Sequence, residues 1–387
     1  MSNKTSNQVI LKVKNLSQHF KTGSGKHKIY NKAVDDVSFE VYEGEVFSLV
    51  GESGCGKTTT GRTIIQLYHP TEGEVIFKGV RISAGFRELR LQKRALNKSL
   101  REFKKDTLQK VTDGQLSKEA ADQEIATFQQ SVDEQIKAIN EETNQRKFDN
   151  RQNNFELMKK MQMIFQDPIA SLNPRMTVKE IIAEGLRIAG EKQEDNIIRL
   201  VNEALETVGL LPEHATRYPH EFSGGQRQRI GIARALVVDP EFIIADEPIS
   251  ALDVSIQAQV INLLNDLREQ KGITIMFIAH DLSVVKYFSD RIGVMYYGKL
   301  VELADKEELF ANPLHPYTLS LQSSIPQPDP RYERLRPPSI KYDPRAEHDY
   351  SVDKPSLREV KPGHFVYCND QEFMMYQKKL GEKNTNA

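Results

Sequence analysis

The decapeptide GESGCGKTTT, residues 51–60, follows the apolar run VFSLV and restricts the fold of this chain more than any other feature. Its glycines allow the backbone to curl, so that several N–H groups converge on one point. A helix beginning just after the loop adds positive partial charge at the same point. The sequence therefore predicts an α/β fold in which a strand, a phosphate-binding loop and a helix follow one another.

Residues near the end of this loop have chemical roles in nucleotide binding. The spacing Gly51-x-x-x-x-Gly56-Lys57-Thr58 is that of a P-loop. Lys57 supplies a mobile positive charge for the β- and γ-phosphates, and the Thr58 hydroxyl is able to ligate Mg²⁺. We interpret Cys55 as a small residue that fills the loop, not as a redox sensor. The P-loop alone leaves kinases, GTPases and motor ATPases open.

A second apolar strand, FIIADE, ends in two carboxylates. Asp246 at the end of the strand is placed to hold the water shell of Mg²⁺. Glu247 is a candidate general base for the attacking water. The alternative, a solvated turn, is weakened by Pro248 and by a further loop carboxylate, Asp253. The sequence thus favours a hydrolase that acts on a nucleotide.

Composition limits the compartment and the partners. The 387 residues are 39% hydrophobic with a formal net charge of −1, which is typical of a globular protein and gives no support to a nucleic-acid partner. Two cysteines indicate a reducing compartment and no disulfide framework. We find no signal-peptide h-region and no run of about 20 apolar residues. We therefore expect a soluble, cytoplasmic protein that works at a membrane only through a partner.

Residues 83–155 differ in character from the rest of the chain. This stretch has no proline, is dense in charged residues and glutamine, and repeats apolar residues at helical spacing in two runs. Gly114 separates the runs, and Ser117 is a candidate N-cap. The pattern predicts a charged helical hairpin, with a partly disordered charged loop as the alternative. Beyond Pro313 the chain is rich in proline, which predicts a tail with a limited core.

A second glycine-rich segment lies in HEFSGGQRQRIGIARAL, residues 220–236. A serine and two glycines open a predicted helix, and such a helix start is able to bind an anion. Two phosphate-binding segments so far apart in sequence need an explanation. The simplest is that this segment serves a nucleotide held by another subunit.

FSGGQ resembles the signature motif of ABC ATPases, and the other motifs of that family occur in the right order. GESGCGKTT resembles Walker A, and FIIADE resembles Walker B. Gln166 in MIFQDP matches the Q-loop glutamine, residues 250–253 resemble the D-loop, and His280 in IAHD matches the switch histidine. Phe20 falls where the family places its adenine-stacking aromatic, with Tyr30 or His19 as alternatives.

The resemblance implies a fold and a set of boundaries. The fold is α/β, a P-loop ABC-type nucleotide-binding domain with a RecA-like core, an antiparallel β-subdomain and a helical subdomain. The implied segments are an ABC ATPase domain at 8–330, a helical insert at about 84–155, a helical subdomain at about 172–236, and a C-terminal extension of the oligopeptide-permease type at 331–387. Most peptide-permease subunits join the strands around the insert by a short connection, so its role is open.

The motifs and the resemblance together imply the site. The catalytic residues are Glu247, His280, Gln166 and Lys57. The ATP-binding residues are Phe20, Gly51, Ser53, Gly54, Cys55, Gly56, Lys57, Thr58, Thr59, Gln166, Ser223, Gly224, Gly225, Gln226, Asp246 and Asp253. Mg²⁺ is held, partly through water, by Thr58, Gln166 and Asp246.

The resemblance also implies a cycle. ATP lies between the P-loop of one protomer and Ser223–Gly225 of the other, so that binding closes the dimer and hydrolysis reopens it. Gln226 and Arg227 steady the signature helix. Cys368 stands alone and is unable to hold an iron–sulfur cluster, which takes about four ligands. We expect no metal site beyond Mg²⁺.

Longer stretches, among them QDPIASLNPRMTV and NPLHPYTLSLQSSIPQPDP, resemble the ATP-binding subunits of oligopeptide permeases. The sequence ASLNPRMTV resembles the F-type subunit more than its D-type sibling. The implied function is energising oligopeptide uptake from the cytoplasmic face of the membrane as a peripheral subunit. The implied partners are a D-type sibling ATPase, two polytopic permease subunits and an external peptide-binding protein. The alternatives are an importer for nickel or another small solute and, more remotely, a soluble ABC ATPase acting on ribosomes or nucleic acid.

Overall fold

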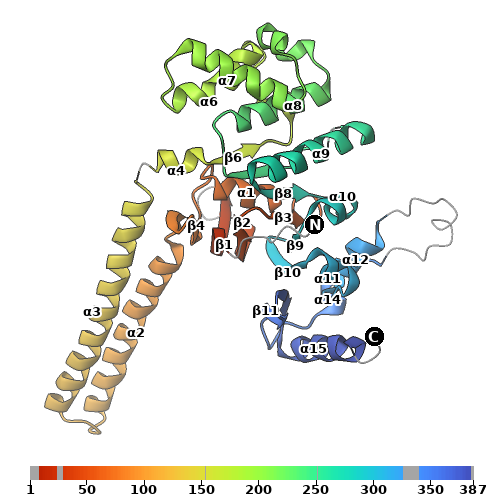
Figure 1. Cartoon of the computed structure of the whole chain (residues 1–387). Coiled ribbons are helices and arrows are strands. Elements are labelled where there is room, and N and C mark those ends of the chain that lie inside the picture. The colour runs from red at the N-terminus through yellow and green to blue at the C-terminus, as the bar shows by residue number, and fades with distance from the viewer. Residues whose placement is uncertain (1–7, 24–28, 153, 251, 326–339, 385–387) are drawn as a thin grey trace.

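Two β-sheets organise the chain in the computed structural model, which describes residues 8–23, 29–152, 154–250, 252–325 and 340–384 (Figure 1). Within these ranges the smaller sheet is antiparallel with the order β2-β1-β4-β5, and the larger has the order β11-β12-β10-β9-β3-β8-β7-β6. The strands are β1 (Val9–Thr22), β2 (Ile29–Tyr42), β3 (Val46–Val50), β4 (Glu72–Phe77), β5 (Val80–Ala84), β6 (Met161–Ile164), β7 (Phe242–Asp246), β8 (Thr274–Ala279), β9 (Arg291–Tyr296), β10 (Lys299–Asp305), β11 (Ser356–Lys361) and β12 (His364–Cys368).

The centre of the larger sheet is parallel and covered on both faces. β3 lies parallel to β8 and β9, and β8 continues in parallel to β7 and β6. Every residue of β3, β7 and β8 is buried, as expected for a parallel sheet covered on both sides. Side chains alternate between the faces, so that Ile243 packs in one hydrophobic core and Ile244 in the other.

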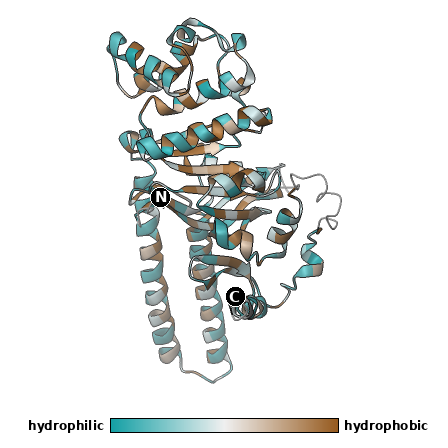
Figure 2. Cartoon of the chain, turned by 45° about the vertical axis from the view of Figure 1, so that its right-hand side comes forward, coloured by the Kyte–Doolittle hydropathy of each residue, from teal (hydrophilic) through white to brown (hydrophobic). Residues whose placement is uncertain are grey.

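Helices cover the sheets and extend away from them (Figures 1 and 2). In Figure 2 the apolar residues concentrate in the sheets and on the inward faces of the helices. The helices are α1 (Lys57–Ile64), α2 (Arg87–Thr112), α3 (Lys118–Asp149), α4 (Phe155–Lys159), α5 (Pro168–Ser171), α6 (Val178–Ile188), α7 (Glu194–Thr207), η1 (Pro212–Thr216), η2 (Pro219–Glu221), α8 (Gly224–Leu236), α9 (Val254–Lys271), α10 (Leu282–Phe288), α11 (Lys306–Ala311), α12 (Pro316–Ser323), α14 (Pro344–Glu347) and α15 (Asp370–Asn384). Over the described ranges, none of them is both long and apolar enough to cross a membrane.

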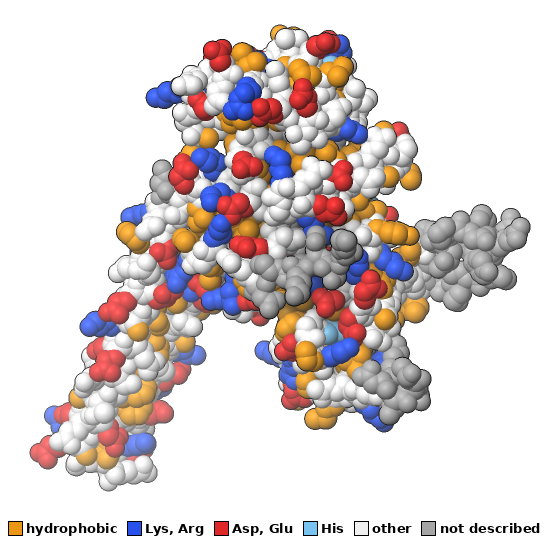
Figure 3. All heavy atoms as spheres, in the orientation of Figure 1, with side chains coloured by type: hydrophobic (Ala, Val, Ile, Leu, Met, Phe, Trp, Pro, Cys, Tyr) orange, Lys and Arg blue, Asp and Glu red, His pale blue; other side chains and the backbone are white. Residues whose placement is uncertain are grey.

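The charged stretch folds as a helical hairpin of α2 and α3, which run side by side away from the sheets (Figure 1). Ser117 caps α3, with its hydroxyl accepting the N–H of Ala120. The rings of Phe103 and Phe128 stack between the helices at a centroid distance of 4.3 Å. Acidic and basic side chains are interspersed over the face shown in Figure 3, so this face carries no field of a single sign.

The C-terminal residues extend the larger sheet. The stretch RIGVMYYGKLVELA forms two antiparallel strands, β9 and β10, because the chain turns at Tyr297-Gly298 with positive φ at both residues. β12 pairs with β10, and β11 pairs with β12. A small buried cluster holds this extension together: Leu314, Val360, Val366, Cys368, Tyr376 and Leu380. The boundary expected between residues 330 and 331 lies outside the described residues.

Candidate active site

The loop from Gly51 to Thr58, here called the phosphate loop, joins the end of β3 to the start of α1. Gly51 has φ +152° and Gly56 has φ +108°, values that side chains rarely allow. A Cβ on Gly51 would lie 2.2 Å from the carbonyl oxygen of Met295, and one on Gly56 would lie 2.2 Å from that of Ala33. Only glycine fits these two positions, and the curled backbone depends on both.

Lys57 lies folded over the phosphate loop. Its Nζ donates to the carbonyl oxygens of Gly51 at 2.7 Å and Glu52 at 3.0 Å, and its side chain is 3% exposed. The same Nζ lies 4.0 Å from Oε1 of Glu247. The ammonium group is thus held between the loop and the end of β7, where an anion in the loop would replace the carbonyl partners.

Asp246 is fully buried at the end of β7. Thr58 Oγ1 donates to its Oδ1 at 2.7 Å, whereas its Oδ2 has no hydrogen-bond donor among the described residues and lies 3.9 Å from Arg62 Nη2. Burial raises the pKa of Asp246, because the charged form loses its hydration. A buried carboxylate oxygen without a donor, beside a hydroxyl, fits a divalent cation that prefers oxygen ligands.

Glu247 is the point at which three strand ends meet. Its Oε2 accepts from Nε2 of Gln166 at 3.0 Å and lies 3.2 Å from Nδ1 of His280. These residues follow β6, β7 and β8, neighbouring parallel strands whose carboxyl ends share one edge of the sheet. Glu247 has φ +42°, a strained conformation of the kind that concentrates at functional sites. Its N–H donates to the carbonyl oxygen of Ile278 at 3.0 Å, which holds that conformation in place.

The segment Ser223–Gln226, here called the signature segment, opens α8 in the helical layer above the sheet (Figure 1). Ser223 and Gln226 form a capping box, in which Gln226 Oε1 accepts the Ser223 N–H at 3.0 Å. Arg227 Nε donates to the carbonyl oxygen of Pro219 at 2.8 Å, which ties the helix to the preceding turn. Within the described ranges, no hydrogen bond or ion pair joins this segment to the phosphate loop.

The expected D-loop leads from Glu247 into α9. Ser250 Oγ donates to the carbonyl oxygen of Glu247 at 3.1 Å, and Asp253 occupies the N-cap position of α9 without a side-chain cap bond. Ala251 lies outside the described residues. The segment is therefore attached directly to the residue at which the three strand ends meet.

The three aromatic candidates near the end of β1 differ in environment. Phe20 is half-buried and meets Tyr68 edge-on, with ring centroids 5.3 Å apart. His19 is a partly buried residue whose side chain is 4% exposed, and its Nδ1 lies 2.9 Å from Arg87 Nη1. Tyr30 is 57% exposed. Phe20 and Tyr30 both keep exposed surface on which a flat ring could stack.

The other loop residues are structural in part. The Cys55 thiol is buried, which raises its pKa, and the Cys55 carbonyl oxygen accepts the N–H of Gly298 at 2.8 Å. Thr59 accepts from the Thr63 hydroxyl through its carbonyl oxygen at 2.7 Å. Ser53 and Gly54 are exposed on the loop. The buried thiol agrees with the interpretation of Cys55 as a residue that fills the loop.

Sequence reasoning missed two residues at the site. Arg62 lies one helical turn after Thr58, and this i+4 spacing within the predicted helix was a usable signal. The Tyr317 hydroxyl, by contrast, accepts the N–H of Glu52 in the phosphate loop at 3.0 Å from 265 residues away. No sequence pattern indicated that contact.

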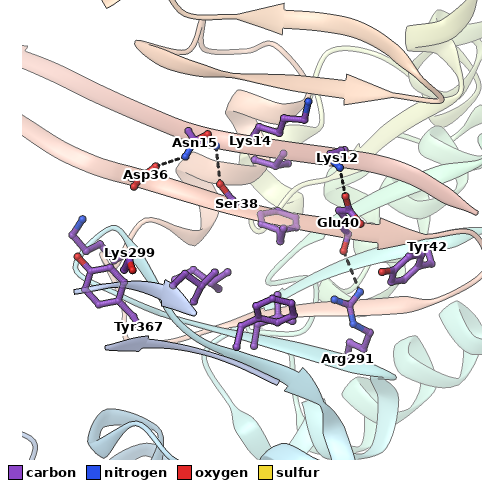
Figure 4. A pocket seen from close by; sticks show the side chains of 17 residues that line it. Lys12, Lys14, Asn15, Asp36, Ser38, Glu40, Tyr42, Arg291, Lys299 and Tyr367 are labelled. Atoms are coloured by element: carbon purple, nitrogen blue, oxygen red, sulfur yellow. Dashed lines mark hydrogen bonds and ion pairs between the residues drawn. The ribbon is translucent and has the colours of Figure 1, made fainter. Parts of the chain in front are cut away.

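A cavity of about 530 Å³ lies elsewhere, between β1 and β2 on one side and the C-terminal strands on the other (Figure 4). None of the residues that line it belongs to the phosphate loop or to the three converging strand ends. Its Lys299 and Arg291 are engaged by Asp35 at 3.0 Å and Glu45 at 3.1 Å. We therefore place the candidate active site at the three strand ends, where the charged and polar groups converge, and not in this cavity.

Comparison with known proteins identifies the site. A family model described as ABC transporter matches residues 34–155 and 125–250, which together carry the phosphate loop, Glu247 and the signature segment. The chain belongs to the ABC transporter family. A second model, described as Oligopeptide/dipeptide transporter, C-terminal region, matches residues 301–351.

Several proteins named as transport ATP-binding proteins resemble the chain over nearly its whole length. The oligopeptide transport ATP-binding protein OppF of Bacillus subtilis is 53% identical, over 95% of this chain and 98% of that protein. OppF of Streptococcus mutans is 46% identical, over 96% and 98%. The dipeptide transport ATP-binding protein DppF of Lactococcus lactis is 45% identical, over 95% and 97%.

Solved ABC cassettes share the fold. A cassette solved as a dimer in a post-hydrolysis state, bound to ADP and Pi, matches 76% of this chain with a TM-score of 0.53 and 25% identity. A component of an ABC transporter complex from Clostridium perfringens matches 85% of this chain with a TM-score of 0.54 and 21% identity. The α/β ABC fold is therefore confirmed, and the chain is an ABC ATPase that binds nucleotide.

Proposed function

We propose that this chain binds and hydrolyses ATP to energise the uptake of oligopeptides by an ABC importer. The observation that carries the proposal is the meeting of Lys57, Gln166 and His280 around Glu247, at the edge of the sheet where the phosphate loop begins. ATP occupies the phosphate loop, and Lys57 exchanges its carbonyl partners for the β- and γ-phosphates.

In this proposal Glu247 accepts a proton from, and orients, the water that attacks the γ-phosphate. Gln166 and His280 both contact the Glu247 carboxylate and so fix its direction. In this proposal His280, whose side chain is 53% exposed, also contacts the γ-phosphate. When bound, Mg²⁺ neutralises charge on the phosphates, and Thr58, Asp246 and Gln166 are the residues that would hold it, partly through water.

The signature segment serves the ATP bound by a partner ATPase in this proposal. The side chains of Ser223 and Gln226 hydrogen-bond within the capping box. Within the described residues, the segment makes no hydrogen bond to the phosphate loop of its own chain. Closing two protomers head to tail would give each phosphate loop the Gly224 and Gly225 amides of the other protomer. Asp253 is the N-cap residue of α9, in the segment that follows Glu247.

The peptide cargo and the partners follow from the relatives. Proteins named for oligopeptide or dipeptide transport are 45–53% identical to this chain over almost all of its length. We therefore assign it the F-type role, with a D-type sibling, two permease subunits and an external peptide-binding protein. It would lie as a peripheral subunit on the cytoplasmic face of the membrane.

We propose the following division into domains. The ATPase domain runs from 8 to 330, with a helical insert at about 84–155 and a helical subdomain at about 172–236. The C-terminal extension runs from 331 to 387.

A transport assay tests the proposal. Cells that lack this chain receive either the wild-type protein or Glu247→Gln, and the uptake of a labelled oligopeptide and of labelled Ni²⁺ is measured side by side. We expect the wild type to restore peptide uptake, the variant to fail, and Ni²⁺ uptake to be the same in both. Restored Ni²⁺ uptake with unchanged peptide uptake would refute the peptide assignment.

A further inference from the structure

Tyr317 joins the C-terminal part of the chain to the phosphate loop. It lies in the first turn of α12, is 1% exposed, and packs against Tyr296 and Tyr342 at centroid distances of 4.4 and 5.6 Å. Its hydroxyl accepts the Glu52 N–H at 3.0 Å. Burial raises the pKa of Tyr317, so the hydroxyl stays neutral.

The contact acts on one particular peptide group. The Glu52 N–H and the Gly51 carbonyl belong to the same planar unit. Tyr317 holds the N–H side of this plane, while the carbonyl on the other side accepts from Lys57 Nζ at 2.7 Å. The orientation of the plane therefore sets the position of one of the two carbonyl oxygens that hold the Lys57 ammonium group.

Buried polar groups hold the start of α12 in place. The Tyr317 N–H donates to Nδ1 of His315 at 3.1 Å, and burial lowers the pKa of His315 to about 3, which keeps that nitrogen an acceptor. The Glu302 carboxylate, fully buried on β10, accepts the N–H groups of Leu314 at 2.8 Å and His315 at 3.0 Å. Tyr317 is thus attached through backbone bonds to a side chain of the sheet.

The C-terminal extension reaches the same carboxylate. His364 at the start of β12 is buried, and its Nε2 lies 2.8 Å from Oε1 of Glu302. On its other side, His364 Nδ1 lies 3.4 Å from Oε1 of Glu308. A continuous set of contacts therefore runs from β12 through Glu302 and the start of α12 to the phosphate loop.

We infer that the C-terminal extension positions the phosphate loop for ATP through Tyr317, which acts as a positioning residue and does not touch the substrate. The inference rests on the proposed ATP site. The Tyr317 hydroxyl fixes the Gly51–Glu52 peptide, and this peptide presets Lys57 for the phosphates. Loss of the hydroxyl removes the partner of the partly buried Glu52 N–H and frees the plane to rotate.

The test compares Tyr317→Phe with Tyr342→Phe in the full chain. Tyr342 lies in the same aromatic cluster, and the phosphate loop makes no hydrogen bond to its hydroxyl within the described residues. Binding of MgATP is measured by calorimetry, and hydrogen exchange at the Glu52 amide is measured without nucleotide. We expect Tyr317→Phe to weaken MgATP binding about five-fold, as for one neutral hydrogen bond, and to speed exchange at Glu52. Tyr342→Phe is expected to match the wild type.

A second variant tests whether the C-terminal extension contributes to holding the Gly51–Glu52 peptide. His364→Gln disturbs the contact with Glu302, and we expect a smaller rise in exchange at Glu52 than with Tyr317→Phe. No rise at Glu52 would refute the role of the extension.

Two outcomes would overturn the role of Tyr317. One is wild-type binding and exchange in Tyr317→Phe. The other is equal weakening by Tyr342→Phe, which would assign the effect to ring packing. A wild-type chain that fails to bind MgATP would refute the proposed function instead. The exchange measurement would then still decide whether Tyr317 holds the Gly51–Glu52 peptide.

Discussion

The phosphate loop and the signature segment are both glycine-rich starts of helices, yet they differ in backbone conformation and in the charged groups around them. The phosphate loop has glycines at positive φ, which glycine adopts without strain but other residues do not, and it brings Lys57 close to Glu247. The signature segment has a capping box, and within the described residues no charged side chain hydrogen-bonds to it. Under the proposed function, the phosphate loop forms one half of an ATP site within the chain. The signature segment forms the other half of the site of a second protomer.

The largest expected effect concerns Glu247, where a substitution should abolish hydrolysis of ATP without abolishing its binding. Glu247→Gln keeps the size of the side chain and removes the general base, so we expect hydrolysis to fall about 10²–10⁴-fold while MgATP still binds. Phosphate release and calorimetry measure the two properties in the purified assembly. Substantial remaining hydrolysis would assign the base to another group.

The next largest expected effect concerns the signature segment. Ser223→Arg places a bulky cation at the start of α8, and we expect hydrolysis to fall about 100-fold while ATP binding to the single chain is unchanged. Sedimentation in the Glu247→Gln background measures whether ATP still drives dimer formation, which we expect to be lost.

Ser117→Arg is the matched control, because Ser117 is also a serine N-cap but opens α3 of the insert. If Ser223→Arg weakened ATP binding to the single chain, the signature segment would belong to the site of its own chain, and the comparison would fail.

A third prediction concerns the strain in the two regions. Gly56→Ala forces a Cβ to within 2.2 Å of the Ala33 carbonyl oxygen, whereas a Cβ on Gly224 would meet its nearest atom, in Leu252, at 3.9 Å. We expect Gly56→Ala to lower the free energy of unfolding by about 2 kcal/mol and Gly224→Ala to change it little. Denaturant titration of both variants measures the difference. Equal losses would show that the strain is not confined to the phosphate loop.

The smallest effect depends on pH. Burial raises the pKa of Asp246 in the folded chain, so its charged form disfavours folding, and stability is lost as pH rises through the folded pKa. Without metal, we expect Asp246→Asn to be more stable than the wild type by roughly 1 kcal/mol at pH 8, with the gap closing as the pH is lowered. Thermal unfolding with and without Mg²⁺ and ATP measures this gap. A less stable variant at pH 8 would show that the bond from Thr58 outweighs the burial of charge.

Local sequence was enough for the regular elements and for part of the site. Apolar runs predicted the central strands, and the spacing of glycines, Lys57 and Thr58 predicted the phosphate loop. The apolar periodicity around Gly114 predicted the helical hairpin. Gln166 and His280 were found only through resemblance to a family, because a lone glutamine or histidine after a strand carries no local signal.

The sequence by itself therefore determined what depends on neighbours along the chain: strand and helix periods, helix caps and the glycines that a curled loop requires. Tertiary structure decided which strand ends lie side by side, and so brought Gln166 and His280 to Glu247. It also decided that the proline-rich C-terminal part continues the sheet and that Tyr317 reaches the Glu52 amide. The physical reason is that sheet order and side-chain contacts are fixed by packing between residues far apart in sequence, from 33 to 265 positions in these contacts, which no local pattern records.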